Sequence, residues 1–240
     1  MYPGEASREM IDAGVFYGRK KTKTNPKMRP FVFANRAGIE IINLQKTADA
    51  LEKAVEFIKE TISKGKELGI VVGTEPAAES ATRALADRFS FPYVTGRWVG
   101  GTITNFPIIS KRVEHMKKTR TGLASGAFES YTKKERLDMD REVKRLEILM
   151  GGLENLSREP DFMIVVNPIV NITAVREARR RKIPIVAFAN VDADPDMIDH
   201  LVPGNDKAKL SISWFMEKME KAIEEGMKMK IAPKVEEPGA

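Results

Sequence analysis

Few residues in this sequence have the types and spacing that catalysis needs. There is no cysteine, and the two histidines are His115 and His200. His115 lies among Lys and Arg residues, which makes it a poor general base but suits a phosphate contact. His200 follows Asp194, Asp196 and Asp199, so a metal site can be drawn there, although Asp-Pro-Asp is also an ordinary turn sequence. The pattern disfavours nucleophilic catalysis and shows no tuned acid–base pair.

A second candidate site is the turn GTEPAA at residues 73–78. Gly73 and Thr74 separate a predicted strand from a predicted helix, where exposed amides can bind a phosphate. The turn lacks both glycine-rich nucleotide-binding patterns, however. Glu75 adds a negative charge and Pro76 removes an amide. An α/β enzyme or sensor that binds a phosphorylated small molecule at Gly73-Thr74 therefore remains the alternative hypothesis.

Cations are concentrated in patterns typical of polyanion binding. Residues 18–29 are polar and basic, and they predict an extended loop with exposed charges. Arg97 and Trp98 precede two glycines, which offers a guanidinium and a stacking ring, although Trp98 would also serve as a core anchor. A predicted helix from residue 106 carries a third set. The candidate RNA-binding residues are Arg19, Lys20, Lys21, Lys23, Lys27, Arg29, Arg36, Arg97, Trp98, Lys111, Arg112, Lys117 and Lys118.

Charge is also separated along the chain, whose 40 Lys and Arg residues against 34 Asp and Glu residues give a net charge of +6. The segment 176–182 holds five basic residues against Glu177, and the segment 192–206 holds five aspartates and no Lys or Arg. This separation predicts one side that faces a polyanion and an opposite, acidic side. The simpler alternative is a set of solvated helix faces.

The elements that must position these residues alternate between strands and helices. Short, continuous apolar runs alternate with helical periodicity, which favours a parallel sheet covered on both faces. The predicted strands are 38–44, 68–72, 91–94, 162–166, 185–188 and 200–202. The predicted helices start at Thr47, where apolar residues recur every three or four positions, at the proposed N-cap Thr74, and near residues 172 and 206.

The segment 105–156 interrupts this alternation. Its first half has apolar residues spaced three, four and three apart, and its second half opens with a capping box formed by Thr132 and Glu135. Each half has a narrow apolar stripe flanked by charges, which predicts an antiparallel helical hairpin that projects as a coiled-coil-like arm.

The length of 240 residues predicts one large domain that carries an excursion. The expected organisation is a flexible tail over 1–9, an α/β body over 10–104 and 157–229, a hairpin insertion over 105–156, and a second flexible tail over 230–240. No apolar run approaches the roughly 20 residues of a membrane-spanning helix. The lack of cysteine fits a reducing compartment. We expect a soluble cytoplasmic protein with no membrane partner.

Six segments, in order along the chain, resemble the bacterial family of the second small-subunit ribosomal protein. They are AGVFYGRKKTKTNPKMRPFVFANRAGIEIINLQKT from Ala13, VVGTEPAAES from Val71, GRWVGGTITNF from Gly96, YTKKE from Tyr131, PDFMIVVNPIVNITAVREARRRKIPIVAFANVDADP from Pro160 and VPGNDKA from Val202.

The resemblance implies a flavodoxin-like, doubly wound parallel sheet with an inserted antiparallel helical hairpin, in the bacterial or organellar branch of the family. It implies a structural, non-catalytic constituent of the small ribosomal subunit that binds small-subunit rRNA and supports translation on the cytoplasmic ribosome. Neighbouring small-subunit proteins are the implied protein partners, and the large mRNA-binding protein numbered first is one candidate among them. No cofactor is implied.

The chain departs from its family at one junction. Bacterial relatives usually have histidines where this chain has Phe16 and Arg19, and an aspartate where it has Asn190. A metal pocket is conceivable in the family, but a ring, a guanidinium and a neutral amide replace its ligands here, and Arg cannot ligate because it stays protonated. We therefore predict no metal at this junction and expect Arg19 to face Asp192 or Asp206 instead.

Overall fold

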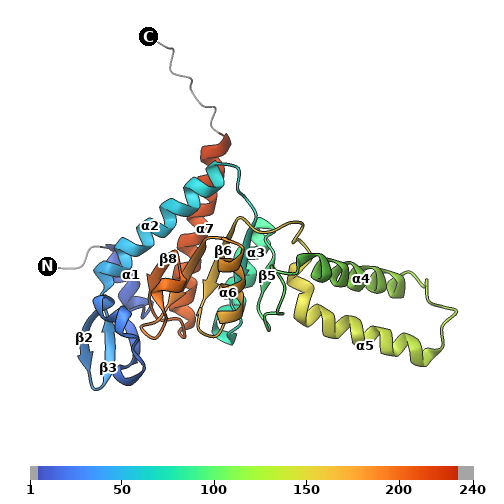
Figure 1. Cartoon of the computed structure of the whole chain (residues 1–240), viewed down its shortest axis with the longest axis horizontal. Helices are drawn as coiled ribbons and strands as arrows, with labels where there is room; N and C mark the ends of the chain where they lie inside the picture. The colour runs from blue at the N-terminus through green and yellow to red at the C-terminus, as the bar shows by residue number, and fades with distance from the viewer. Residues whose placement is uncertain (1–4, 232–240) are drawn as a thin grey trace, which may run out of the picture.

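A five-stranded parallel sheet forms the centre of the computed structural model, which describes residues 5–231 (Figure 1). The chain passes from β4 to β5 on one side and then returns to β6 on the other side of β4, so the winding reverses between β4 and β6. The strands lie in the order β5-β4-β6-β7-β8 and are β4 (Gly69–Val72), β5 (Tyr93–Val94), β6 (Phe162–Val166), β7 (Ile185–Ala189) and β8 (His200–Pro203).

The strands are continuous apolar runs because the sheet is covered on both faces. Along β6, Phe162 and Ile164 belong to the hydrophobic core on one face, whereas Met163 and Val165 belong to the core on the other face. This alternation buries every residue of the strand. The predicted doubly wound α/β class is therefore confirmed.

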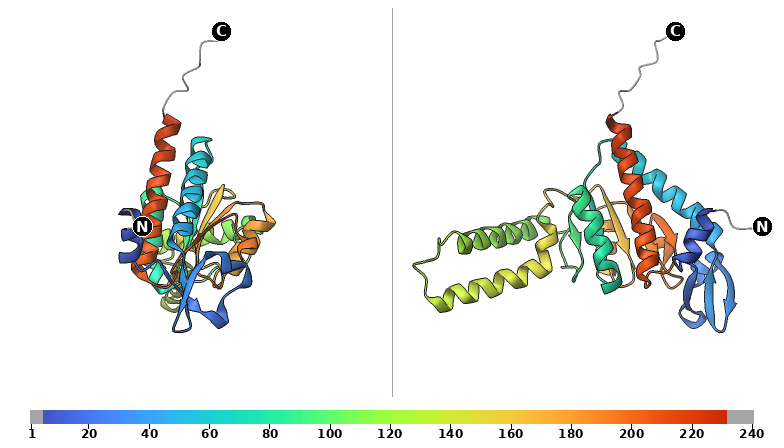
Figure 2. Two further views of the ribbon diagram at one scale, coloured as in Figure 1. Left: turned by 90° about the vertical axis from the view of Figure 1, so that its left-hand side faces the viewer. Right: turned by 180° about the vertical axis from the view of Figure 1, so that it is seen from behind.

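The helices form a layer on each face of the sheet (Figure 2). Three long helices pack together on one face, and a short helix lies on the other together with the base of a helical pair. The first layer consists of α2 (Leu44–Ser63), α3 (Pro76–Phe89) and α7 (Lys209–Ile231), and the second consists of α6 (Ile172–Arg180) with the first turns of α4 (Phe106–Ala124) and the last turns of α5 (Lys133–Met150).

The N-terminal module, residues 17–42, is a second, antiparallel sheet beyond the β8 edge (Figure 1). The predicted strand over 38–44 belongs to this module and not to the parallel sheet. The predicted loop over 18–29 is also wrong, because Met28 is buried against Ile42 and Val191 and fixes the segment. The module contains β1 (Tyr17–Lys20), η1 (Lys21–Lys23), η2 (Pro26–Phe31), β2 (Val32–Arg36) and β3 (Ile39–Ile42).

The arm consists of α4, α5 and their connection, and it extends from the β5 edge (Figure 1). Its two helices pack along the predicted stripe, in which Val113 and Met116 of α4 are buried together with Leu146 and Met150 of α5. The Thr132 hydroxyl accepts a hydrogen bond from the Glu135 amide at 3.3 Å, and the Glu135 carboxylate accepts one from the Thr132 amide at 2.9 Å. The predicted capping box is confirmed.

Two predicted boundaries are wrong. Helix α2 begins at Leu44 because Asn43 accepts hydrogen bonds from the amides of Gln45 and Lys46, and Thr47 instead donates to the carbonyl of Pro203 at 2.9 Å. Residues 1–4 of the first predicted tail lie outside the described residues, but residues 5–9 belong to α1 (Glu5–Asp12), which the buried Met10 anchors. The second predicted tail over 230–240 lies mostly outside them, and residues 230 and 231 belong to α7.

No helix within residues 5–231 has both the length and the apolar character needed to cross a membrane.

Candidate nucleic-acid interface

The outward cations of the N-terminal module are the best-exposed part of the predicted interface. They come from β1, η1, η2 and the end of β2, and within residues 5–231 none of their side chains has a carboxylate partner. The pairing of β1 and β2 with β3 therefore presents them on a folded surface and not on a loop. These residues are Lys20, Lys21, Lys23, Arg29 and Arg36.

Two predicted phosphate ligands of this module pair with carboxylates of the segment 192–206. The Arg19 guanidinium contacts Asp206 at 2.7 Å and Asp192 at 3.4 Å, which confirms the expected pairing. Lys27 lies 3.3 Å from Asp194 and also pairs with Asp196. The acidic segment 192–206 therefore does not form an opposite side of the molecule. It binds the N-terminal module, and Lys27 is neutralised at a surface where it had been expected to meet RNA.

The junction around Arg19 does not fit a metal ion. Asn190 donates from Nδ2 to the carbonyl of Tyr17 at 3.2 Å, while its Oδ1 accepts from the Val191 amide at 2.8 Å. Burial raises the pKa of Asp206 to about 6, because desolvation outweighs the attraction of the Arg19 guanidinium, and Asp192 opposes that attraction. The Arg19 guanidinium therefore supplies the positive charge beside Asp192 and Asp206 that a metal ion would otherwise provide.

The two candidate RNA-binding residues in the loop before the arm differ in exposure. Arg97 is exposed, but Trp98 is only 8% exposed and donates from Nε1 to the Glu177 carboxylate at 3.0 Å. The prediction that Trp98 stacks on RNA is therefore wrong, because the ring belongs to the core beneath α6. The alternative reading of Trp98 as a core anchor is confirmed.

Glu177 organises this loop, and the sequence reading missed that role. Its Oε1 also accepts from the Gly101 amide at 2.7 Å, and its Oε2 accepts from the amides of Ile103 and Thr104 at 3.1 Å. Burial alone would raise the pKa of Glu177, but these hydrogen bonds together outweigh burial and lower it. The available signal was spacing, since Glu177 lies beside Ala174 and Ala178 on the apolar face of α6.

The four predicted cations of the arm differ in their surroundings. Lys111 and Arg112 are exposed, and the described residues give them no carboxylate partner. Lys118 is exposed and paired with Glu114 one turn earlier at 2.8 Å. Lys117 is half-buried and donates to the carbonyl of Glu154 at 2.8 Å, so it fastens α4 to the segment that follows α5. Lys117 is therefore a structural contact.

The alternative phosphate site at the first helix of the parallel sheet is closed by the protein itself. Thr74 is not the N-cap of α3, because Glu75 occupies that position and Pro76 follows. The Thr74 hydroxyl donates to Asn171 at 2.9 Å. The Glu75 carboxylate is buried at the switch point between β4 and β6, where it accepts from Asn167 at 3.2 Å and pairs with Lys207. A phosphate would meet this fixed negative charge.

The metal reading of His200 is not supported either. Its ring stacks on Phe57 with centroids 4.1 Å apart. Asp194 and Asp196 bind Lys27, and Asp199 accepts from the Ile185 amide at 2.9 Å. Among the described residues, no three acidic, histidine or cysteine side chains are grouped as metal ligands would be.

Glu75 places a buried carboxylate at the switch point of this doubly wound α/β body, and cations at both ends have no carboxylate partner within residues 5–231. This combination favours a protein that binds a polyanion over an enzyme that binds a small phosphate. The family model described as ribosomal protein S2 matches residues 10–226. The small ribosomal subunit protein uS2 of Corynebacterium glutamicum is 40% identical over 222 residues, which cover 92% of this chain and 84% of that protein. The corresponding protein of Thermus thermophilus is 40% identical over 85% of this chain and 80% of its own length.

The chain therefore belongs to the ribosomal protein S2 family. This confirms the resemblance found in the sequence. Members of the family are structural, non-enzymatic proteins of the small ribosomal subunit, so the enzyme or sensor alternative is not supported.

Proposed function

We propose that this protein binds small-subunit rRNA through unpaired cations at the two ends of its α/β body and holds that RNA in the cytoplasmic ribosome without catalysis. The outward cations are exposed and have no carboxylate partner within residues 5–231. This observation carries the proposal, because phosphate recognition uses free Lys and Arg side chains. The proposed contacts are Lys20, Lys21, Lys23, Arg29 and Arg36 of the N-terminal module, Arg97 of the loop, and Lys111 and Arg112 of the arm. Lys118 is left out because it pairs with Glu114.

Replacing Lys20, Lys21 and Lys23 with Ala tests this assignment. Each phosphate contact contributes about 0.7–0.9 to the slope of log affinity against log salt concentration. We expect the triple variant to lower this slope by about 2–3 for purified protein binding to small-subunit rRNA. We expect an unchanged melting temperature, because these side chains are exposed and form no ion pair within the described residues.

The matched control replaces Lys53, Lys66 and Lys228, which are exposed cations of α2, the turn after it and α7. It changes net charge equally and should leave the slope within the error of the wild type. If both triple variants lower the slope equally, binding follows net charge alone and the N-terminal module is not the interface.

We further propose that the outer face of the N-terminal sheet binds a neighbouring small-subunit protein, with the large mRNA-binding protein numbered first as the candidate. Phe33 is 74% exposed, and Tyr17 and Ile39 are exposed beside it, lining a shallow apolar hollow. Exposed apolar groups gathered on one face are typical of protein contacts. This hollow contrasts with the cationic surface around it.

Replacing Phe33 with Ser should leave rRNA affinity unchanged and reduce the amount of a neighbouring protein retained in reconstituted small subunits, as measured by quantitative mass spectrometry. Ile148→Ser is the control, since Ile148 is 76% exposed but lies on the arm. A loss of rRNA affinity in Phe33→Ser with all proteins retained would instead assign the ring to base stacking.

A further inference from the structure

Helix α6 carries a dense group of exposed cations that the interface described above leaves out. The helix packs Ala174, Val175 and Ala178 against the parallel sheet, and its opposite side faces solvent. Cations at the C-terminal end of a helix are favoured by the helix dipole, which helps this group to coexist. The exposed cations of α6 and the turn that follows are Arg176, Arg179, Arg180, Arg181 and Lys182.

The charge of this group is largely uncompensated. The carboxylate of α6, Glu177, is buried and bound to the loop before the arm, so it faces away from the cations. Within residues 5–231, Arg176, Arg180 and Lys182 have no carboxylate partner, and the one ion pair of the group joins Arg181 to Glu159 at 3.4 Å on the surface. A surface pair of that kind is weak.

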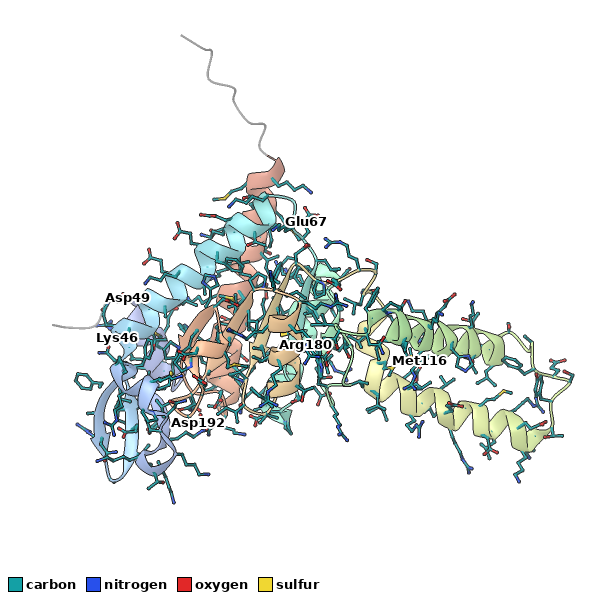
Figure 3. The ribbon with its side chains drawn as sticks, viewed as in Figure 1. Lys46, Asp49, Glu67, Met116, Arg180 and Asp192 are labelled. Atoms are coloured by element: carbon teal, nitrogen blue, oxygen red, sulfur yellow. The ribbon has the colours of Figure 1, made fainter. Side chains whose placement is uncertain are left out.

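Arg179 near the end of α6 and Arg181 just after it connect the helix to the two ends of the body. Arg179 donates to the carbonyl of Asp196 at 2.6 Å, and the Asp196 side chain pairs with Lys27 of the N-terminal module. Arg181 donates to the carbonyl of Thr104 at 3.1 Å, two residues before α4 begins. Both acceptors are neutral carbonyls, so these two hydrogen bonds do not neutralise the guanidinium charges. Figure 3 marks Arg180 on α6, between the N-terminal module and the arm.

We propose that α6 is a third rRNA-binding surface, in which Arg176 and Arg180 contact phosphates and join the cations of the N-terminal module to those of the arm in one track. This inference rests on the proposed rRNA-binding function and extends it to the centre of the molecule. The partner is the sugar–phosphate backbone of RNA, because planar guanidinium groups pair with phosphate oxygens in a bidentate manner.

An acidic protein surface is a less suitable partner. Protein interfaces have an apolar or aromatic centre in addition to charge. Between Ile172 and Lys182, no large apolar side chain is exposed, and the exposed positions are polar or cationic. Phosphate contacts need no apolar centre, so the composition of this face fits RNA.

The test uses the full chain carrying Arg176→Gln and Arg180→Gln. Binding to small-subunit rRNA is measured over a range of salt concentrations. Loss of two phosphate contacts should lower the slope of log affinity against log salt by about 1.4–1.8. The matched control, Lys53→Gln with Lys228→Gln, removes the same charge from the opposite helix layer and should leave the slope unchanged. Arg176→Lys with Arg180→Lys keeps the charges and should restore the wild-type slope.

Three results would contradict the proposal. If the α6 variant and the control have the same slope, α6 does not contact RNA. If the α6 variant binds rRNA normally but loses a neighbouring protein from reconstituted subunits, the face binds protein. If the wild type shows no salt-dependent rRNA binding, the proposed function fails as a whole. If the α6 variant melts at a lower temperature, the Arg→Lys variant decides between loss of charge and loss of structure. A wild-type slope in the Arg→Lys variant supports the proposal. A reduced slope contradicts it, because that variant keeps both charges.

Discussion

Replacing Glu177 with Gln should destabilise the protein by at least about 3 kcal/mol. The carboxylate accepts five hydrogen bonds, from the indole of Trp98, the amides of Gly101, Ile103 and Thr104, and the Thr104 hydroxyl. Hydrogen bonds to a charged group contribute about 1.5–3 kcal/mol each, and a glutamine turns an amide group toward donors that it cannot satisfy. The melting temperature should fall by roughly 6–12 °C.

Trp98→Phe is the matched control, because it removes one donor and keeps the ring in the core. It should cost about 1.5 kcal/mol apart from packing changes, at the lower end of the range for a bond to a charged group, because the other donors to the carboxylate remain. Hydrogen exchange at the amides of Gly101, Ile103 and Thr104 should accelerate in Glu177→Gln and stay close to the wild type in Trp98→Phe. Equal effects of the two substitutions on stability and on exchange would show that the carboxylate is not the organising group.

Replacing Arg19 with Met should cost about 3 kcal/mol of unfolding free energy at pH 8, as measured by denaturant titration. The substitution leaves Asp206, whose side chain is 1% exposed, beside Asp192 without its cation. Loss of one partner from a buried pair typically costs about 3–5 kcal/mol, and the partial exposure of Arg19 places the effect at the lower end.

The cost should depend on pH in a defined direction. Asp206 has a folded pKa of about 6, above its ordinary value of 3.8, so the folded state binds the proton more tightly than the unfolded state. The stability that this group contributes is complete below about pH 4 and is lost as the pH rises through 6. Without Arg19 the pKa rises further, so the difference between Arg19→Met and the wild type should be small near pH 5 and grow toward pH 8.

Lys27→Met provides the control for this series. Its pairs with Asp194 and Asp196 are exposed, so its loss should destabilise the protein far less than the loss of Arg19. The double variant Arg19→Met with Asp206→Asn should recover most of the stability, because no buried charge remains without a partner. A cost for Arg19→Met that does not change between pH 5 and pH 8 would refute the linkage to Asp206.

The sequence predicted best what neighbouring residues determine. The apolar runs of β4, β6 and β7, the stripe of the arm and the capping box at Thr132 were all readable, because each depends on spacing within one element. The strand at 39–42 was recognised as a strand but placed in the wrong sheet. Its partners β1 and β2 are set by antiparallel pairing and by the burial of Met28, which no local pattern encodes.

The candidate site was harder to predict because the direction of a charged side chain depends on its distant partner. Arg19 and Lys20 are neighbours in the sequence, but one faces Asp206 across the junction and the other faces solvent. Composition placed both in one basic loop, and comparison with the family was needed to distinguish Arg19. The role of Glu177 could not be predicted for the same reason. In the sequence, a single acid among arginines is typical of a surface ion pair, and the loop that it binds is distant in sequence.

Two sets of ion pairs attach the N-terminal module to the segment 192–206, one made by Lys27 and one by Arg19, and salt should affect them differently. Mobile ions weaken exposed charge pairs, such as those of Lys27, and they weaken contacts between surface cations and phosphates in the same way. The contact of Arg19 with Asp206 is partly shielded from solvent and escapes most of this screening. Rising ionic strength should therefore release the protein from RNA before it loosens the module, so that protein washed from the particle keeps the shape needed to bind again.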